Sequence, residues 1–383
     1  MDFEFTQEQT LLRDALQSYL RDHYTFEARR RAVLSDAGWR REVWQTLGRD
    51  LGVLGVAVPE RAGGFGGGAV ETMIVMEELG AVLFVEPFLE TCVMAAGALA
   101  RIGGEVADEA LARIATGDAV FACGWEEAAA GASLAAIETR ARRHAQGGWR
   151  LDGAKQVVMA APWATQLLVA ARTSGARGDD AGISLFLVDK HARGVAARDY
   201  ATIDGRWASD LVFDGVDVSA HALLGEEGGA LALLDAVRDA TIAAVCAEGV
   251  GVLKKLLGDT VDYTRERKQF GQPIARFQAL QHRMVDMYLQ VELAQSAMYL
   301  AALSLDEPAA QRQRATSAAK VSVSKACRFV GQNAVQLHGA MGMTDELALG
   351  HYFKRATVIE SAFGGVDHHL ARHARLTASP AFS

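Results

Sequence analysis

The spacing of apolar residues changes twice along this chain, and that change limits the folds open to it. From Thr6 to about Ile114, apolar residues recur every three or four positions, as in amphipathic helices. From about Asp118 to Leu224 the chain breaks into short β-like runs separated by Gly, Asp or Ser, and helical spacing then returns. We therefore predict an α+β fold with an N-terminal α-helical domain (1–117), a middle antiparallel β-barrel or sandwich (118–224) and a C-terminal four-helix bundle (225–383).

Local signals place the first helix and two of the later ones. Thr6 and Gln9 stand at the spacing of a capping box, which predicts a helix start. Two apolar stripes at helical spacing are expected to face the core, one from Ile242 to Leu256 (Ile242, Val245, Gly249, Val252, Leu256) and one from Met284 to Val291 (Met284, Met287, Tyr288, Val291). Several helices are apolar over more than half their circumference, so we expect other helices or another chain to cover them.

Composition indicates a folded protein of several domains and excludes some functions. Of 383 residues, 50% are apolar and 22% charged, which is enough to build a large core. The net charge of −8 includes no block of like charge, so nucleic-acid binding is not expected. The basic run from Arg29 to Arg41 is interrupted by acidic and apolar residues, and we interpret it as a solvated helix face.

Cysteine usage and the N-terminal residues bear on location. The four cysteines are far apart, with no Cys-x-x-Cys pair and no histidines at metal spacing, which indicates reduced core residues and no metal site. Residues 1–20 carry charges throughout, and no run reaches the ~20 apolar residues that a bilayer span needs. We expect a cytoplasmic protein without a membrane span.

Two motifs near the C-terminus carry groups suited to a dinucleotide. TRERKQFGQPIARFQALQH (264–282) and AVQLHGAMGM (334–343) lie about 70 residues apart. Arg267 offers a planar fork of donors to phosphate, Phe270 an apolar face, Gln336 an amide, and Gly339 close approach of backbone. Arg267 could instead pair with Glu266 or Asp262, and Gln336 and Gly339 could belong to an ordinary helix-end turn. The earlier VPERAGGFGGG (58–68) is not interpreted as a phosphate loop, because no strand clearly precedes it and it lacks the lysine.

With its helix–β–helix order, VPERAGGFGGG followed by MEELG, and the two C-terminal motifs, the chain resembles the acyl-CoA dehydrogenases over essentially its whole length. In that family the first motif carries Arg-x-x-Phe-Gly and Phe-Gln, and the second Gln-x-x-Gly-Gly-x-Gly. The resemblance implies FAD as cofactor, an acyl-CoA substrate and electron-transfer flavoprotein as acceptor. It also implies that Arg267, Phe270, Gln336 and Gly339 reach across a dimer interface onto a neighbour's flavin. Ala340 stands where the family usually has its second glycine.

Elsewhere the chain departs from the family pattern. The family's middle domain usually carries a Thr-Glu-x-x-x-Gly-Ser loop and, later, Trp-Ile-Thr beside the flavin ring. The corresponding stretches read FACGWEEAAAGA (121–132) and KQVVMAAP (155–162), so Val157 and Met159 replace the ring-covering tryptophan and a hydroxyl. Trp125 or Trp163 could substitute, although we expect each to be a buried or rim tryptophan.

The positions of the catalytic base differ too. The chemistry needs a carboxylate that removes the α-proton of the acyl thioester. Where the family has Glu before Gly-Thr, this chain has Phe363 before two glycines, and the second known position, near residue 241, holds Thr241 and Ile242. Glu360, one helical turn from Phe363, is the remaining candidate for a shifted base, so the sequence assigns no catalytic residue.

Loss of the chain's own flavin contacts, with those offered to a neighbour retained, resembles the small subunits of heterotetrameric acyl-CoA dehydrogenases. These include the pimeloyl-CoA dehydrogenase small subunits and enzymes acting on steroid-side-chain CoA esters. The resemblance implies an assembly of two copies of this chain with two of a related subunit. A self-sufficient homo-oligomer using Glu360, or a non-catalytic scaffold, are the alternatives.

Overall fold

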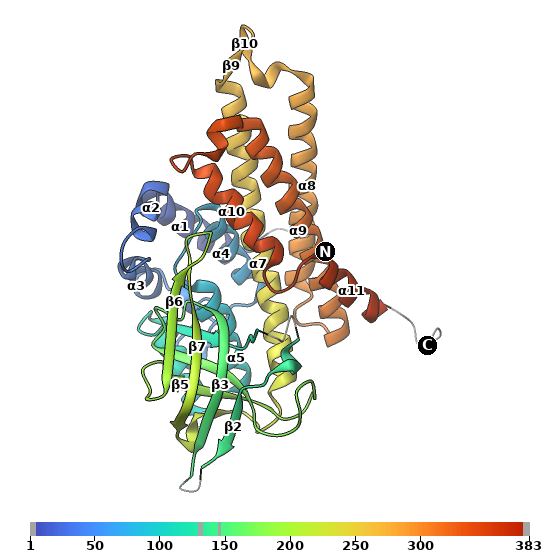
Figure 1. The fold of residues 1–383 in the computed structure, drawn as a ribbon. Coiled ribbons are helices and arrows are strands. Elements are labelled where there is room, and N and C mark those ends of the chain that lie inside the picture. Colours follow the sequence, from blue (N-terminus) through green and yellow to red (C-terminus); the bar gives the residue numbers. More distant parts are fainter. Residues whose placement is uncertain (1–4, 129–132, 145–146, 378–383) are drawn as a thin grey trace. The chain divides into compact units, whose positions relative to one another are not determined.

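The computed structural model describes residues 5–128, 133–144 and 147–377, and the chain divides into two compact units. The first unit combines residues 1–31, 69–84 and 242–383, and the second combines 32–68 and 85–241. Helices and a sheet occur together, as the α+β prediction requires (Figure 1). Within the described residues, no helix has both the length and the apolar character needed to cross a bilayer.

The first unit is helical. Its helices are α1 (Gln7–His23), α4 (Ala69–Ala81), α8 (Gln278–Leu303), α9 (Ala309–His338), α10 (Ala348–Ser361) and α11 (Val366–Thr377). Helix α9 packs against α8, α10 and α11. Two further helices, α2 (Phe26–Val33) and α7 (Ala230–Glu266), have residues in both units.

Helix α1 begins as its sequence predicts. The Thr6 hydroxyl accepts a hydrogen bond from the Gln9 backbone N–H at 3.2 Å, and the Gln9 side chain accepts one from the Thr6 N–H at 3.0 Å. The two bonds satisfy backbone donors that the first helical turn would otherwise leave unpaired. The capping box is confirmed.

Helices α4 and α7 approach one another closely through glycine. A Cβ at Gly80 of α4 would collide with the carbonyl oxygen of Glu248, and one at Gly251 of α7 would collide with the carbonyl oxygen of Glu77. The stripe from Ile242 to Leu256 is buried along its length, as predicted. The two helix backbones are therefore in direct contact, which only glycine permits.

Two expectations about helix faces are wrong. Tyr288 belongs to the second predicted stripe, yet it is 52% exposed, whereas Met287 and Val291 are buried. Helix α8 also exposes apolar residues at intervals of four, namely Val285, Leu289 and Leu293, because it is apolar on more than one face.

Arg29, the first residue of the basic run, does not lie on a solvated face. It is 2% exposed, and its Nε donates to the carbonyl oxygen of Leu83 at 2.8 Å. Burial of a guanidinium requires such a partner, because an unpaired buried donor is costly.

The second unit contains one eight-stranded sheet flanked in sequence by short helices. The helices are α3 (Arg41–Arg49), α5 (Ala96–Ile102) and α6 (Glu105–Ala115), with 3₁₀ turns at Val53–Gly55 and Glu60–Ala62 and a π-helix at Leu89–Ala95. The strands are β1 (Phe121–Gly124), β2 (Arg140–Arg143), β3 (Trp149–Met159), β4 (Gln166–Arg172), β5 (Ile183–Asp189), β6 (Val195–Ala201), β7 (Trp207–Val218) and β8 (Leu223–Leu224).

The strand order is β6-β7-β3-β2-β4-β5-β8, with β1 paired to β4. β1 and β2 run parallel to β4, so the expectation of a purely antiparallel sheet is wrong for these two pairs, and every other pair in the sheet is antiparallel. The four cysteines are buried and free, as expected.

Candidate functional site

The backbone of Arg267 is held on both sides. Arg267 directly follows α7, and its N–H donates to the carbonyl oxygen of Tyr263 at 2.8 Å. Its own carbonyl oxygen accepts from the N–H of Ile274 at 2.8 Å, which closes the base of the following hairpin. The position of Arg267 is therefore set by its backbone, while its side chain lies exposed.

The Arg267 side chain has no ionic partner within the described chain. Asp262, one of the two partners considered for it, lies 3.5 Å from Arg265 instead. Glu266, the other, makes no ion pair with it, and across residues 5–128, 133–144 and 147–377 the guanidinium forms no side-chain hydrogen bond. An arginine fork on a fixed backbone is thus available to a ligand.

Phe270 lies at the tip of a two-stranded hairpin made by β9 (Lys268–Gln269) and β10 (Gln272–Pro273). It is 90% exposed, and the tip residues Phe270 and Gly271 have φ angles of +53° and +78°. The left-handed region costs a bulky residue about 1–2 kcal/mol. An aromatic ring held in strain and in water suits a residue whose contact lies in another molecule.

Gln336 and Gly339 lie at the C-terminal end of α9. Gly339 caps the helix with φ +61°, and its N–H bonds to the carbonyl oxygens of Gln336 and Val335. This is the helix-end turn considered for the motif, yet it leaves the motif accessible: a Cβ at Gly339 would meet nothing within 4 Å. The exposed Gln336 amide forms no hydrogen bond with any residue that the structure describes.

The ends of α7 and α9 meet through two rings. Tyr263 stacks on His338 with centroids 4.2 Å apart and planes at 24°, and the Tyr263 hydroxyl donates to the His338 carbonyl oxygen at 3.4 Å. Since Arg267 follows Tyr263 by one helical turn and Gly339 follows His338 directly, both motifs lie at one end of the first unit. Figure 1 shows the β9–β10 hairpin at that end of α7 and α8.

In the sheet unit, the stretch corresponding to Thr-Glu in the family pattern reads Glu126-Glu127. Glu127 takes a 2.6 Å ion pair from fully buried Lys155 and a 2.6 Å hydrogen bond from the Thr139 hydroxyl. Burial lowers the pKa of Lys155 to about 8, against the opposing effect of Glu127. Glu127 therefore has a structural partner, and Glu126 places a carboxylate where the pattern has a hydroxyl.

Val157 occupies a strained bulge of β3. The pairing of β3 with β7 shifts between Lys155 and Val158, and Val157 takes φ +51° with its side chain 52% exposed. Its N–H donates to Asp210 Oδ1 at 3.1 Å, and this bond is the largest cause of the lowered Asp210 pKa. The Tyr200 hydroxyl also donates to Asp210, at 2.9 Å. The bulge is thus firmly held, but no indole stands on it.

The two tryptophans that could substitute are packed within their own unit. Trp125 is 4% exposed, and its indole N–H has no hydrogen-bond partner among the described residues. Trp163 stacks on Trp39 at 5.4 Å and donates to the carbonyl oxygen of Ala37 at 2.8 Å. Both are placed as expected for a buried and a rim tryptophan.

No carboxylate stands at either known position of the base. Phe363, after the end of α10, has φ +56°. Thr241 is buried in α7 with its hydroxyl donating to the Val237 carbonyl oxygen at 2.8 Å, and Ile242 is 1% exposed. None of these side chains can accept an α-proton.

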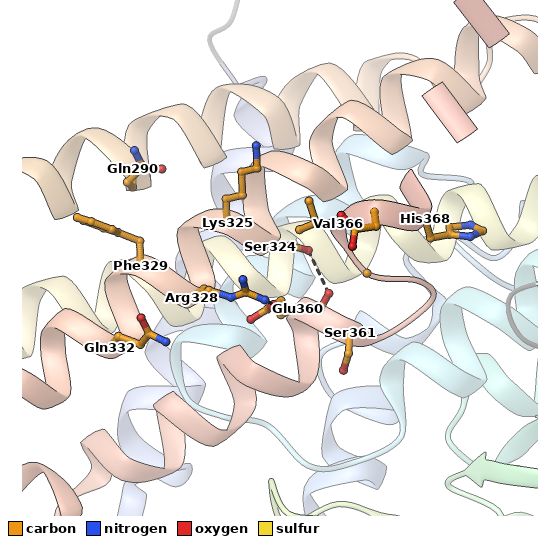
Figure 2. A pocket seen from close by; sticks show the side chains of 12 residues that line it. Gln290, Ser324, Lys325, Arg328, Phe329, Gln332, Glu360, Ser361, Val366 and His368 are labelled. Carbon is orange, nitrogen blue, oxygen red and sulfur yellow. Dashed lines mark hydrogen bonds and ion pairs between the residues drawn. The ribbon is translucent and has the colours of Figure 1, made fainter. Parts of the chain in front are cut away.

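Glu360 borders an open pocket of about 700 Å³ in the first unit. The pocket is lined from α8, α9, α10 and the start of α11, by Gln290, Ser324, Lys325, Arg328, Phe329, Gln332, Glu360, Ser361, Gly365, Val366, Asp367 and His368. Figure 2 shows Arg328 and Glu360 pointing toward one another, and they form an ion pair. The Glu360 carbonyl oxygen accepts from Ser324 at 3.2 Å. The carboxylate has a cationic partner, as a structural residue would.

The loop around Phe363 is held by two buried side chains that sequence patterns did not single out. Lys320 Nζ donates to the carbonyl oxygens of Ile359 at 2.8 Å and Gly364 at 3.2 Å. His369 Nε2 donates to the carbonyl oxygen of Phe363 at 3.1 Å, and burial lowers the His369 pKa to about 3. A neutral His369 therefore secures the loop at physiological pH.

Family models match three stretches of the chain. They are the acyl-CoA dehydrogenase N-terminal domain over residues 6–118, the middle domain over 122–216 and the C-terminal domain over 240–375. Together they span most of its length. The chain belongs to the acyl-CoA dehydrogenase family.

Relatives of this acyl-CoA dehydrogenase include proteins solved as complexes. It is 30% identical to acyl-CoA dehydrogenase FadE27 of Mycobacterium tuberculosis over 392 residues, covering 100% of both chains. A chain of the ChsE4-ChsE5 complex from Mycobacterium tuberculosis matches with 29% identity, TM-score 0.88 and 100% coverage of both. A chain from a variant of the Tcur3481-Tcur3483 steroid ACAD matches with 30% identity and TM-score 0.88, covering 98% of this chain and 99% of that one.

The family's cofactor is FAD, and the two parts of this acyl-CoA dehydrogenase fit it differently. Unpaired Arg267, exposed Phe270 and the open backbone at Gly339 fit the phosphate and adenosine end of a dinucleotide. In the sheet unit, Glu126 and Val157 offer neither the hydroxyl nor the indole that a flavin ring would contact. The chain therefore fits a flavin at its C-terminal motifs and not at its own middle-domain motifs.

Proposed function

We propose that this chain is one subunit of an FAD-dependent acyl-CoA dehydrogenase, and that it completes a flavin site held mainly by a related partner subunit. The assembly would be a heterotetramer of two copies of each, with two flavins. It would introduce an α,β double bond into an acyl-CoA thioester and pass electrons to electron-transfer flavoprotein, in the cytoplasm. Bound FAD would take up the hydride from the β-carbon, and the base for the α-proton would come from the partner.

The observation that carries this proposal is the hairpin tip. Phe270 is 90% exposed in a strained conformation, next to an arginine fork without a partner in the described chain. Exposure of a large aromatic ring forgoes about 1.5–3 kcal/mol of burial. A ligand at the surface of a second subunit would recover that burial and would occupy the Arg267 fork as well.

The chain's own middle domain supports the same conclusion by contrast. Val157 and Met159 cannot replace lost hydrogen-bond partners of a flavin, and each orphaned polar contact costs roughly 1–3 kcal/mol. Two or three such losses would weaken flavin binding by several decades. The solved relatives named as pairs, ChsE4-ChsE5 and Tcur3481-Tcur3483, support a heteromeric assembly here too.

Native mass spectrometry with a flavin count tests the assembly. The chain purified alone should show no absorbance band near 450 nm, and the complex with its partner should hold two flavins per four subunits. Steroid-CoA esters are the first substrates to assay, since one relative is named as a steroid ACAD. A homotetramer of this chain alone with four flavins would refute the proposal.

Glu360 provides the test of a self-sufficient enzyme. Because its carboxylate is paired with Arg328, we expect Glu360→Gln to leave turnover of the assembled enzyme within about tenfold, whereas loss of a true general base costs ~10²-fold or more. Turnover is measured with flavin content and unfolding temperature as controls. A loss of the larger size, with both controls normal, would make Glu360 the base.

A further inference from the structure

The contact between the ends of α7 and α9 has a role that no family motif assigns. We infer that the stacked pair Tyr263 and His338 is a positioning device, which sets the Arg267 guanidinium relative to Gln336 and Gly339 so that all three grip the same adenosine-diphosphate end of FAD. The inference rests on the proposed function. It concerns positioning residues, since neither ring is required to touch the flavin.

The first step is that each ring is rigidly attached to one motif. The Tyr263 carbonyl oxygen accepts the Arg267 N–H at 2.8 Å, so the residue that stacks also holds the backbone of the arginine. His338 is the last residue of α9 and directly precedes Gly339, and Gln336 lies two positions before it. A shift of either ring would move the motif attached to it.

The second step is that the two rings are themselves fixed. His338 is 5% exposed, and its Nδ1 donates to the carbonyl oxygen of Ala334 at 2.8 Å, which fixes the ring plane. The Tyr263 hydroxyl reaches the His338 carbonyl oxygen at 3.4 Å, so one residue contacts both the ring and the backbone at the end of α9. Burial lowers the His338 pKa, which favours the neutral ring that stacks.

The third step is that the ligand-facing side chains of the two motifs do not hold one another. Arg267 has no side-chain partner, and Gln336 has none, across the described ranges 5–128, 133–144 and 147–377. Their relative position therefore depends on the backbones that carry them. A displacement of about 1 Å in such groups is enough to cost ~10²-fold in a positioned interaction.

The test compares FAD with FMN, which lacks the adenosine-monophosphate end. Flavin-free complex of this chain with its partner is titrated with each, for wild type, Tyr263→Leu, Tyr263→Phe and His338→Leu. Tyr263→Leu and His338→Leu should weaken FAD about tenfold or more and leave FMN within about twofold, since only the adenosine-diphosphate contacts are lost. Tyr263→Phe retains the stack and should behave as wild type.

The matched control is Trp39→Leu, which removes a stacked ring from the sheet unit, where Trp39 packs on Trp163 at 5.4 Å. It should lower the unfolding temperature without changing the ratio of FAD to FMN affinity. An unchanged ratio in Tyr263→Leu and His338→Leu, or an equal fall in Trp39→Leu, would overturn the inference. If Tyr263→Leu does not assemble, His338→Leu decides. Failure of the wild-type complex to bind FAD would instead reject the proposed function, and the inference with it.

Discussion

Arg267→Ala is expected to weaken FAD binding by the assembled enzyme by about one to two decades, with this chain still folded. The guanidinium is exposed and has no side-chain partner among the described residues, so its removal breaks no contact within the chain. A charge-assisted hydrogen bond to phosphate contributes on the order of 1.5–3 kcal/mol, which corresponds to that change in affinity. Equilibrium titration of the flavin-free complex measures it, with the unfolding temperature recorded alongside.

Arg265→Ala is the matched control for this experiment. Arg265 lies two residues earlier with a similarly exposed side chain, but it pairs with Asp262 at 3.5 Å. It should leave FAD affinity unchanged. If Arg267→Ala and Arg265→Ala gave the same affinity, Arg267 would have no place in the flavin site.

The largest effect on stability is expected at the buried ion pair between α7 and α10. Arg355 Nε and Nη2 donate to the two carboxylate oxygens of Glu248 at 2.7 and 2.6 Å, with side chains 6% and 1% exposed. Glu248→Ala would leave a buried guanidinium without its carboxylate, which costs about 3–5 kcal/mol. The free energy of unfolding from urea denaturation measures this loss.

Two further variants separate the lost pair from other causes. Glu248→Leu combined with Arg355→Met should recover most of the stability, because apolar residues of similar size can replace a buried pair at little cost. Asp217→Ala removes the bidentate partner of Arg150, at 2.8 and 3.1 Å, from an exposed pair and should have a much smaller effect. Equal losses in Glu248→Ala and Asp217→Ala would contradict the account of burial.

Features that depend on neighbouring residues could be predicted from the sequence. The capping box of α1 requires only Thr6 and Gln9, and the buried stripe of α7 requires only helical spacing from Ile242 to Leu256. The change of texture at either end of the sheet is similarly local. The order of helices, sheet and helices followed from these patterns.

Predictions failed where local pattern and tertiary environment disagree. Strand β6 was missed because VAARDYA is mostly exposed and carries Arg198 and Asp199, as an edge strand can. Tyr288 was assigned to a buried stripe because α8 is apolar on more than one face. Arg29 was assigned to solvent because the Leu83 carbonyl that receives it lies 54 residues away.

The candidate site divides in the same way. Arg267, Phe270, Gln336 and Gly339 could be named from motifs, and their role at a flavin stays a prediction. The side chains that hold those motifs and the Phe363 loop could not, because Tyr263 meets His338 across 75 residues and Lys320 meets Ile359 across 39. No spacing rule connects positions so far apart.

The positive φ angles at Val157 and Phe363 have an implication for how such a chain changes over generations. Each of these backbones is still clamped in its unusual shape, by Asp210 in one unit and by His369 in the other, although the side chains there are plain hydrocarbons. Shape and chemistry at these positions are thus independently inherited. A lineage could surrender or regain reactive groups by single-codon steps without refolding the protein, which makes duplicated subunits of this architecture easy to specialise into unequal pairs.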